Sequence, residues 1–364
     1  MPDPAQDSRF MALAHALGRR GFGSAWPNPA VGAVIVRDDG RVVGRGWTQP
    51  GGRPHAEIEA LARAGPAARG ATIYVTLEPC SHQGRTPPCA DAIVAAGIKR
   101  VVSAIEDPNP AVAGRGHARL RASGIALDIG LGAEEARRAH AGHVLRMREG
   151  RPRVLLKLAI SADGKAGLAG PRPMAITGEP ARARVHLMRA MNDAILIGIG
   201  TALADDPLLT VRLPGMADRS PVRVVLDSAL RLPLTSALVN SAAETPVWAV
   251  GAPEAPAEGA RGLEGQRVNV LSAAAHDGKL DLRAVLKLLA QHGITRLMVE
   301  GGPTVAAAFV AADLVDEAAL FRSPKVVGAT GIDAGMPVEM LARRLRLVGR
   351  DTVGDDSVEF LERA

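Results

Sequence analysis

The chain has 364 residues and a net charge of +6, a length typical of two globular domains. Its two cysteines are too few for a disulfide scaffold, so we expect a cytoplasmic protein, and the acidic start of the chain argues against a secretory signal. No apolar run of about 18 residues occurs, so neither a membrane-spanning helix nor a membrane partner is predicted.

The positive charge is concentrated early in the chain. Residues 1–150 carry a net +5 and residues 151–364 a net +1. A basic half is typical of proteins that bind nucleic acid or a phosphorylated small molecule. The five Phe, three Trp and one Tyr offer few rings on which bases could stack. Composition alone leaves both classes of ligand open.

Alternating apolar segments predict a three-layer α/β domain in the first part of the chain. We expect helices over 8–20, 55–64, 90–96, 116–123 and 133–149, and strands over 31–36, 41–46, 71–77, 100–105 and 125–129. Five strands would form one sheet. Asp7 or Ser8 is placed to cap the first helix. The segment Gly150–Arg153 is the predicted linker between domains 1–149 and 150–364.

The pattern restarts after this linker. We expect strands over 154–160, 194–199, 222–226, 247–250 and 296–300, and helices over 180–191, 282–292 and 303–311. Residues 252–281 are rich in Ala, Gly, Pro and charged residues and are expected to form a variable surface region. No G-x-G-x-x-G motif follows a strand here, which argues against a Rossmann domain.

Both cysteines of the chain lie near a His-x-Glu motif. His55 and Glu57 precede Cys80 and Cys89, the pattern of zinc-dependent nucleobase deaminases. His55, Cys80 and Cys89 would bind one Zn²⁺ and leave its fourth position to a water, whose pKa the metal lowers. Glu57 is placed to move protons between that water and the base. Cys89 begins a predicted helix, where the helix dipole favours a thiolate.

A structural zinc site would need a fourth Cys or His. His82 is the nearest candidate, within an eight-residue insert between the two cysteines. The insert also contains an arginine, and both residue types suit a phosphorylated or polar substrate. We therefore favour a catalytic zinc site over a structural one.

Two patterns stand out in the second half. Gly301 and Gly302 follow a strand and open a helix, a geometry that binds phosphate or only reverses the chain. The adjacent Asp205 and Asp206 could cap a helix or bind a metal, and capping is the better reading of the pattern alone.

Longer motifs resemble one known family, the bifunctional riboflavin-biosynthesis deaminase–reductases. Residues 76–89 (TLEPCSHQGRTPPC), 27–29 (PNP) and 107–110 (DPNP) resemble its deaminase half. Residues 157–158, 161–164, 201–207, 227–228 and 300–304 resemble its reductase half. The resemblance implies a cytidine-deaminase-like three-layer α/β/α domain followed by a dihydrofolate-reductase-like α/β domain, with one Zn²⁺ and NADPH as cofactors.

The implied chemistry has two steps. A diaminopyrimidine, 2,5-diamino-6-(5-phosphoribosylamino)pyrimidin-4(3H)-one, would lose ammonia by hydrolysis. NADPH would then reduce 5-amino-6-(5-phosphoribosylamino)uracil to its ribitylamino product.

The resemblance also implies site residues. Deaminase substrate contacts are expected at Asn28, His82, Asp107 and Asn109. NADPH contacts are expected at Ala159, Ala175, Thr201, Asp205, Ser228, Gly302, Pro303, Thr304, Val305, Ala306, Ala307 and Ala308. Reductase substrate contacts are expected at Pro173, Arg189, Leu209, Arg212 and Glu300, with the arginines suited to a 5′-phosphate. Lys157, Asp205 and Glu300 would either polarise or protonate the reacting amine or form an ordering ion-pair network.

The chain departs from the family at Pro173-Met174-Ala175, where many members have Ser-x-Trp. A serine contact to substrate and a tryptophan contact to cofactor are therefore missing. Two rival functions remain: a tRNA base deaminase with an accessory domain, and a non-catalytic zinc-stabilised binding module, which would not need Glu57. We expect no nucleic-acid partner and a homo-oligomer, with the apolar helix near 303–312 as a possible interface.

Overall fold

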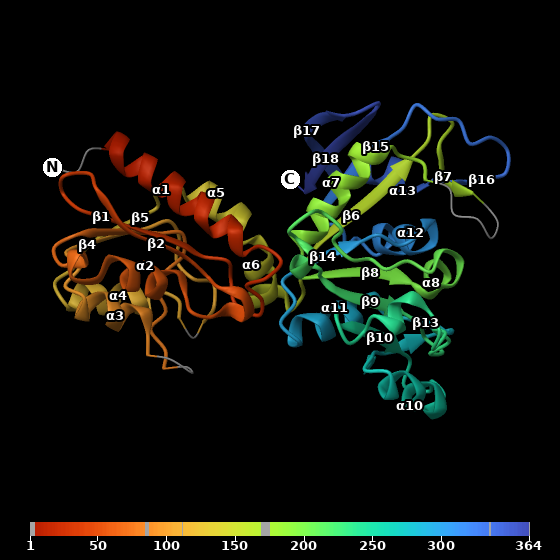
Figure 1. Ribbon diagram of the computed structural model, residues 1–364, viewed down its shortest axis with the longest axis horizontal. Helices are drawn as coiled ribbons and strands as arrows, with labels where there is room; N and C mark the ends of the chain where they lie inside the picture. Colours follow the sequence, from red (N-terminus) through yellow and green to blue (C-terminus); the bar gives the residue numbers. More distant parts are fainter. Residues whose placement is uncertain (1–3, 84–86, 111, 169–174, 335, 364) are drawn as a thin grey trace. The chain divides into compact units, whose positions relative to one another are not determined.

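The computed structural model describes residues 4–83, 87–110, 112–168, 175–334 and 336–363. The chain divides into two compact units, Met1–Gly150 and Arg151–Ala364 (Figure 1). Each unit has its own sheet and core. In the described part of the chain, no helix combines the length and apolar character needed to cross a membrane.

Unit 1 contains one five-stranded sheet, the number of strands that the sequence predicts, and its strand order is β2-β1-β3-β4-β5. Its strands are β1 (Gly32–Val36), β2 (Val42–Trp47), β3 (Thr72–Val75), β4 (Arg100–Ser103) and β5 (Ala126–Ile129). Its helices are α1 (Pro4–Gly18), α2 (Ala56–Ala64), α3 (Cys89–Ala95), α4 (Arg115–Ala122), α5 (Ala133–Ala139) and α6 (Ala141–Glu149), with short 3-10 turns η1 (Arg19–Gly21), η2 (Pro50–Gly52) and η3 (Gly65–Ala68). Helices α1 and α5 cover one face, and α2, α3 and α4 cover the other (Figure 1).

Glycines in β2 bring α2 close to the sheet. A Cβ atom on Gly46 would lie 2.2 Å from the carbonyl oxygen of Ala56, and one on Gly44 equally close to that of Ala60. Any larger residue would push the helix away. This close packing fixes the first turn of α2, which carries His55 as its N-cap and Glu57.

Two expectations for unit 1 are wrong. Neither Asp7 nor Ser8 caps α1, because the helix begins earlier, at Pro4, where proline is tolerated. Asp7 is buried and accepts hydrogen bonds from Tyr74 and Arg100. The single helix over 133–149 is two helices, since the backbone turns at His140 and its ring lies against Thr76.

Unit 2 contains a nine-stranded sheet in the order β11-β10-β9-β8-β14-β6-β15-β18-β17, in which β18 runs antiparallel to its neighbours. Its strands are β6 (Arg153–Ile160), β8 (Ala194–Gly198), β9 (Val222–Leu226), β10 (Val247–Gly251), β11 (Asn269–Ser272), β14 (Arg296–Val299), β15 (Glu317–Arg322), β17 (Leu345–Val353) and β18 (Asp356–Arg363). Two small pairs are β7 (Lys165–Leu168) with β16 (Gly331–Asp333) and β12 (Ala275–His276) with β13 (Lys279–Leu280). The helices are α7 (Glu179–Ala190), α8 (Ile199–Asp205), η4 (Ala217–Arg219), α9 (Ala237–Asn240), α10 (Ala257–Gly265), α11 (Leu282–Gln291), α12 (Pro303–Ala311) and α13 (Met336–Arg344).

Unit 2 contains helices and strands that the sequence pattern did not predict. Residues 252–281 contain α10 and the edge strand β11, because the buried side chains of Leu263 and Val268 attach this segment to the core. The C-terminal strands β15, β17 and β18 had no predicted counterpart. Helix α12, named above as a candidate interface, packs Phe309 and Val310 against the core of unit 2 and leaves Thr304 and Ala308 exposed.

The strand order identifies the functional edge of the second sheet. β14 lies between β8 and β6. The chain passes from β8 outward to β9 on one side of this point and from β14 to β15 on the other side. Ligands of parallel α/β sheets bind beyond the carboxyl ends of strands at such a reversal. Glu300 and the turn at Gly301 follow β14 at this edge.

Candidate functional site

The three predicted zinc ligands lie together in unit 1. His55 precedes α2, Cys80 follows β3 in a loop, and Cys89 opens α3. The Nδ1 atom of His55 lies 3.3 Å from Sγ of Cys89 and 3.7 Å from Sγ of Cys80. Tetrahedral zinc with ordinary bond lengths requires N–S separations of about 3.5 Å. The donor set therefore fits Zn²⁺ and leaves a fourth position open.

The two thiols are electrostatically coupled. A hydrogen bond with the Cys89 side chain, joined by one from its backbone N–H at 3.3 Å, lowers the pKa of Cys80 to about 4. The same side-chain bond and burial raise the pKa of Cys89. These contacts favour the thiolate on Cys80 rather than on Cys89, and a thiolate is the form that binds a metal.

Glu57 lies in the first turn of α2, two residues after His55. Only 3% of its surface is exposed, and this burial raises its pKa to about 7. A carboxyl with a pKa near 7 can both accept and release a proton near neutral pH. Its position and acidity match the predicted proton-transfer role.

Asn28 orients the histidine ligand. Its Nδ2 donates to the carbonyl of Gly52 at 2.8 Å and lies 3.3 Å from Nε2 of His55. The ring therefore turns Nδ1 toward the sulfurs. Gly52 has φ +82°, and a Cβ there would lie 2.7 Å from Nδ2 of Asn28, so glycine is required.

The remaining predicted deaminase contacts differ in exposure. Asp107 is buried and its Oδ1 accepts the backbone N–H of Asn109 at 2.8 Å, which closes a turn after β4. His82 is exposed and is not among the grouped zinc ligands. Since β3 and β4 are parallel neighbours, the Asp107 turn and the Cys80 loop leave the same edge of the sheet.

Glu78, Glu106 and His117 form a second group with metal-binding potential in the described residues. The Glu78 carboxylate already accepts four backbone N–H groups, from Asp107, Gly114, Gly116 and His117, at 2.8–3.1 Å. These bonds occupy its oxygens, so the group organises the loop after β4.

In unit 2, Arg189 and Glu300 form a bidentate ion pair. Nε and Nη2 of Arg189 lie 2.7 and 2.8 Å from the Glu300 oxygens, and both side chains are about nine-tenths buried. Burial opposes the charge of Glu300, but Arg189 and Lys157 outweigh it and the pKa of Glu300 is lowered. The two hydrogen bonds hold both charged side chains in one orientation at the carboxyl edge of the sheet.

Lys157 projects from β6 beside this pair. Burial, opposed by the charge of Glu300 and assisted by that of Arg189, lowers the pKa of Lys157. Its Nζ lies 5.9 Å from the centre of the Phe321 ring. A desolvated lysine with lowered pKa releases a proton more readily than one in water.

Arg212 is exposed and lies near the Arg189–Glu300 ion pair. Partial desolvation and the positive charge of Arg189 lower its pKa. An anion held between the two arginines would relieve this repulsion. Leu209, buried with φ +55°, lies in the same loop.

Sequence reasoning missed His186. Its Nδ1 lies 3.0 Å from the carbonyl oxygen of Thr210 and 3.4 Å from the backbone nitrogen of Arg212. It is three residues before Arg189 on α7, so both face one side of the helix. That spacing is the sequence signal that could have identified it.

The glycine turn after β14 fits a phosphate-bearing cofactor. A Cβ on Gly301 would lie 2.6 Å from Cβ of Val305, so only glycine allows this close turn. Gly302 donates its backbone N–H to Oγ1 of Thr201 at 3.2 Å. No described side chain caps the N-terminus of α12. Such a helix start has free N–H groups for an anion.

The other predicted NADPH contacts vary in accessibility. Thr304 and Ala308 are exposed one turn apart on α12, whereas Ala306 is fully buried. Asp205 is exposed and Ser228 half-buried. Pro303, Val305, Ala307 and Ala159 are half-buried, and the carbonyl of Ala175 accepts from Lys325. Pro173 and Met174 lie outside the described residues.

The acidic pair near α8 does not form a grouped metal site in the described residues. Asp206 ends α8, and its Oδ1 accepts the N–H of Ala237 at 2.8 Å.

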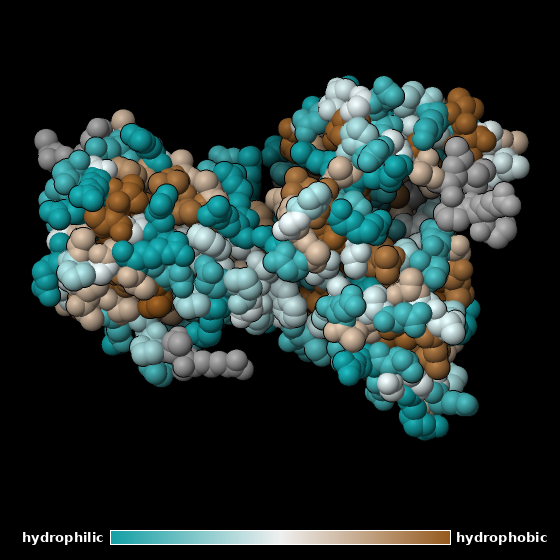
Figure 2. Space-filling view, viewed as in Figure 1, coloured by the Kyte–Doolittle hydropathy of each residue, from teal (hydrophilic) through white to brown (hydrophobic). Residues whose placement is uncertain are grey.

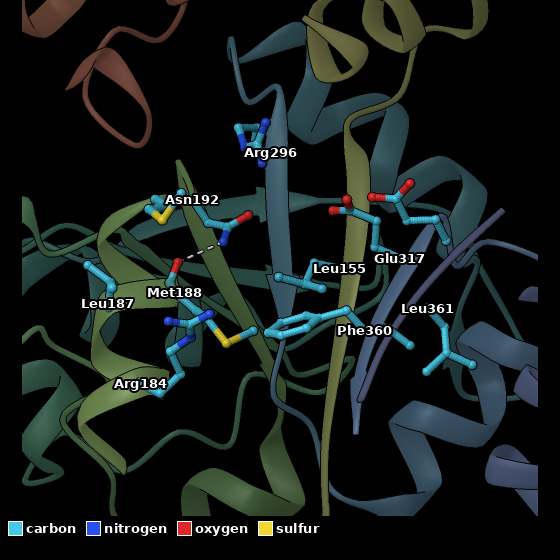
Figure 3. A pocket seen from close by; sticks show the side chains of 12 residues that line it. Leu155, Arg184, Leu187, Met188, Asn192, Arg296, Glu317, Phe360 and Leu361 are labelled. Carbon is cyan, nitrogen blue, oxygen red and sulfur yellow. Dashed lines mark hydrogen bonds between the residues drawn. The ribbon is translucent and has the colours of Figure 1, made fainter. Parts of the chain in front are cut away.

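A separate pocket of about 440 Å³ lies at the opposite edge of the second sheet. Its lining includes Leu155, Arg296 and Glu317, from the starts of their strands, together with Met188 and Phe360 (Figure 3). None of the predicted site residues lines it. It is therefore distinct from the edge that carries Glu300.

Comparisons with known proteins give one matching family model in each unit of the chain. Residues 4–105 match the family described as the cytidine and deoxycytidylate deaminase zinc-binding region, and residues 152–358 match the RibD C-terminal domain. The riboflavin biosynthesis protein RibD of Escherichia coli (strain K12) is 43% identical over 95% of this chain and 98% of its own length. That of Aquifex aeolicus (strain VF5) is 39% identical over 98% of both.

Solved structures are equally similar. Acinetobacter baumannii RibD, form 1, superposes with a TM-score of 0.87 at 37% identity over the whole of both chains. The Thermotoga maritima diaminohydroxyphosphoribosylaminopyrimidine deaminase/5-amino-6-(5-phosphoribosylamino)uracil reductase gives 0.84 at 33% identity over 99% of both chains.

Fold and site together define a two-domain enzyme, a zinc-dependent deaminase joined to an NADPH-dependent reductase. The chain belongs to the RibD family of riboflavin biosynthesis proteins. Its function is the bifunctional deamination and reduction of that pathway, with Zn²⁺ and NADPH as cofactors. The expected fold class is confirmed, and the tRNA deaminase alternative is not supported.

Proposed function

We propose that residues 1–149 perform the deamination and residues 150–364 the reduction. The observation that carries the first assignment is the convergence of His55, Cys80 and Cys89 around one point, with the buried Glu57 in the same turn as His55. The substrate is the phosphoribosyl diaminopyrimidine, and the substrate of the second unit is its deaminated product.

In the deaminase, His55, Cys80 and Cys89 would hold the zinc, which would supply a water of lowered pKa for hydrolysis at C2. Glu57 takes a proton from that water and passes it to the exocyclic amine, which leaves as ammonia. The pKa of about 7 suits both transfers. Asn28, His82, Asp107 and Asn109 contact the ring or the ribose phosphate.

In the reductase, Arg189 and Arg212 hold the 5′-phosphate, while Leu209, Glu300 and Pro173 line the substrate. When bound, NADPH would supply the hydride for reduction at C1′ of the opened ribose. Lys157 is the first candidate for proton donor because its pKa is lowered and it lies beside Glu300. Asp205 is the alternative donor, since partial desolvation raises the pKa of its carboxyl although the residue is exposed.

The NADPH site comprises the turn 302–308 and residues from the neighbouring strand ends. Gly302 and Thr201, already hydrogen bonded to one another, would flank the cofactor phosphate at the start of α12. The remaining contacts are Ala159, Ala175, Asp205 and Ser228.

Selective zinc removal tests the assignment of deamination to residues 1–149 and of reduction to residues 150–364. Chelation should abolish ammonia release from the diaminopyrimidine, while NADPH oxidation with the deaminated intermediate continues at the untreated rate. Added Zn²⁺ should restore deamination. Loss of both activities on chelation, or of neither, would contradict the assignment.

We further propose a cytoplasmic homo-oligomer that has no nucleic-acid partner. On the face drawn in Figure 2, most of each unit's surface is hydrophilic, with small separate apolar areas. Light scattering gives the oligomeric state, and an inosine assay with tRNA checks the nucleic-acid statement.

A further inference from the structure

Three polar residues recur at three-residue spacing along α6. His140 is its N-cap, and His143 and Arg146 follow within the helix. Residues three apart lie on the same side of a helix. The helix lies outside residues 4–105, the segment that matches the zinc-binding deaminase region.

Each of these side chains contacts a different segment of the deaminase site. Nε2 of His140 lies 3.1 Å from Oγ1 of Thr76, at the end of β3 before the Cys80 loop. Arg146 donates to the carbonyl of Pro27 at 2.8 Å, next to the Asn28 that orients His55.

The third contact reaches a predicted substrate residue. Nε2 of His143 donates to Oδ1 of Asp107 at 3.0 Å, and both residues are buried. The same oxygen accepts the N–H of Asn109, while the N–H of Asp107 is held by Glu78. His143 therefore holds Asp107 through its side chain, whereas Glu78 holds it through its backbone N–H.

We propose that α6 is a positioning element of the deaminase and that His143 is its main positioning residue. It acts through Asp107, holding the Asp107–Asn109 turn in register with the zinc ligands. The proposal rests on the proposed function of unit 1, because it assigns that turn to substrate binding.

The physical argument is the cost of an unpaired buried acceptor. Without His143, Oδ1 of Asp107 keeps only the local N–H of Asn109, and a cavity replaces the imidazole. The carboxylate would regain partners by moving, and the turn would move with it. Zinc binding does not depend on this turn, because His55, Cys80 and Cys89 lie on other segments.

Steady-state kinetics of four full-length proteins test the proposal. In His143→Ala, the KM for the diaminopyrimidine should rise about 10-fold, with one zinc per chain and an unchanged reductase rate. His143→Gln retains a side-chain N–H donor and should recover most of the loss. The matched control is Arg148→Ala, on the exposed side of the same helix, which should equal the wild type.

A double mutant separates positioning from general stability. In an Asp107→Ala background, His143→Ala should add less than about twofold, because its target is already gone. Additive losses, equal defects in the Ala and Gln variants, loss of zinc, or an unchanged KM in His143→Ala would each overturn the proposal. If the wild type releases no ammonia from the diaminopyrimidine, the proposed function fails instead.

Discussion

The acidity of Glu57 follows from its place in the first turn of a helix packed tightly on β2. Burial raises its pKa to about 7, although the neighbouring His55 opposes that shift. The backbone contact of Gly46 with α2 maintains this burial. The absence of a Cβ atom at Gly46 thus helps to keep Glu57 buried, and burial is what brings the pKa of its carboxyl near 7.

Glu57→Gln should keep one zinc per chain and lower deamination at least about 100-fold, because glutamine cannot carry the proton. Ammonia release and metal analysis measure the two effects. NADPH reduction of the deaminated intermediate is the internal control and should not change. Deamination within about tenfold of the wild type would contradict the proton-transfer role.

A second residue-level prediction concerns Lys157. If it donates the proton in reduction, the rate should fall as pH rises through its pKa, and at a lower pH than the value of about 10.4 for an ordinary lysine. The sign follows because only the protonated amine donates. Lys157→Met should lower the rate and remove this alkaline limb. If the limb persists in Lys157→Met, another group, with Asp205 the first alternative, carries the proton.

At the scale of elements, α1 is attached to the sheet by a polar contact. Nη1 and Nη2 of Arg100 lie 2.9 and 2.7 Å from the Asp7 oxygens, and Tyr74 donates to Asp7 at 2.5 Å. The hydrogen bond from Arg100 lowers the pKa of Asp7. The stability from this contact is therefore present above the unfolded-state pKa and is lost as pH falls through the folded value.

Asp7→Ala should destabilise α1 by about 3 kcal/mol, because Arg100 and Tyr74 lose a buried partner. Hydrogen exchange of the α1 and β3 amides measures the change. Ser8→Ala is the matched control, since Ser8 is exposed and its hydroxyl donates to Pro4 within the same helix. Equal exchange in both variants would show that the contact contributes little.

On the scale of the whole molecule, each unit contains all the residues that we propose as zinc ligands, proton carriers or the Arg189–Glu300 ion pair for its own reaction. His55, Cys80, Cys89 and Glu57 all lie in Met1–Gly150, and Lys157, Arg189 and Glu300 all lie in Arg151–Ala364. On the proposed assignment, neither reaction uses a residue of the other unit, and we expect that one activity can be removed without the other.

Mixing two variants tests this independence. Glu57→Gln and Lys157→Met should each block one step, and together they should convert the diaminopyrimidine to the ribitylamino product. The intermediate leaves one chain and enters another, so the mixture should show a lag that shortens with protein concentration. No product from the mixture would mean that the intermediate must pass within one chain.

The sequence alone determined the chemistry of unit 1 and most of the helices and strands. His-x-Glu, Pro-Cys and Cys are chemically specific, and helix 303–311 was predicted with the bounds that the structure has. Local periodicity depends on neighbours in the chain, so these features need no tertiary information. The long motifs likewise sufficed for the family.

Only the tertiary structure decided which distant side chains meet. Asp7 was predicted to cap a helix, but it forms an ion pair with Arg100, 93 residues away in the chain. The helix predicted over 133–149 is interrupted at His140, whose ring contacts Thr76. No motif identifies His143, because its partner Asp107 is set by packing, and packing likewise brings His186 to Thr210. Hydrogen bonds between remote segments depend on three-dimensional distance, which periodicity does not contain.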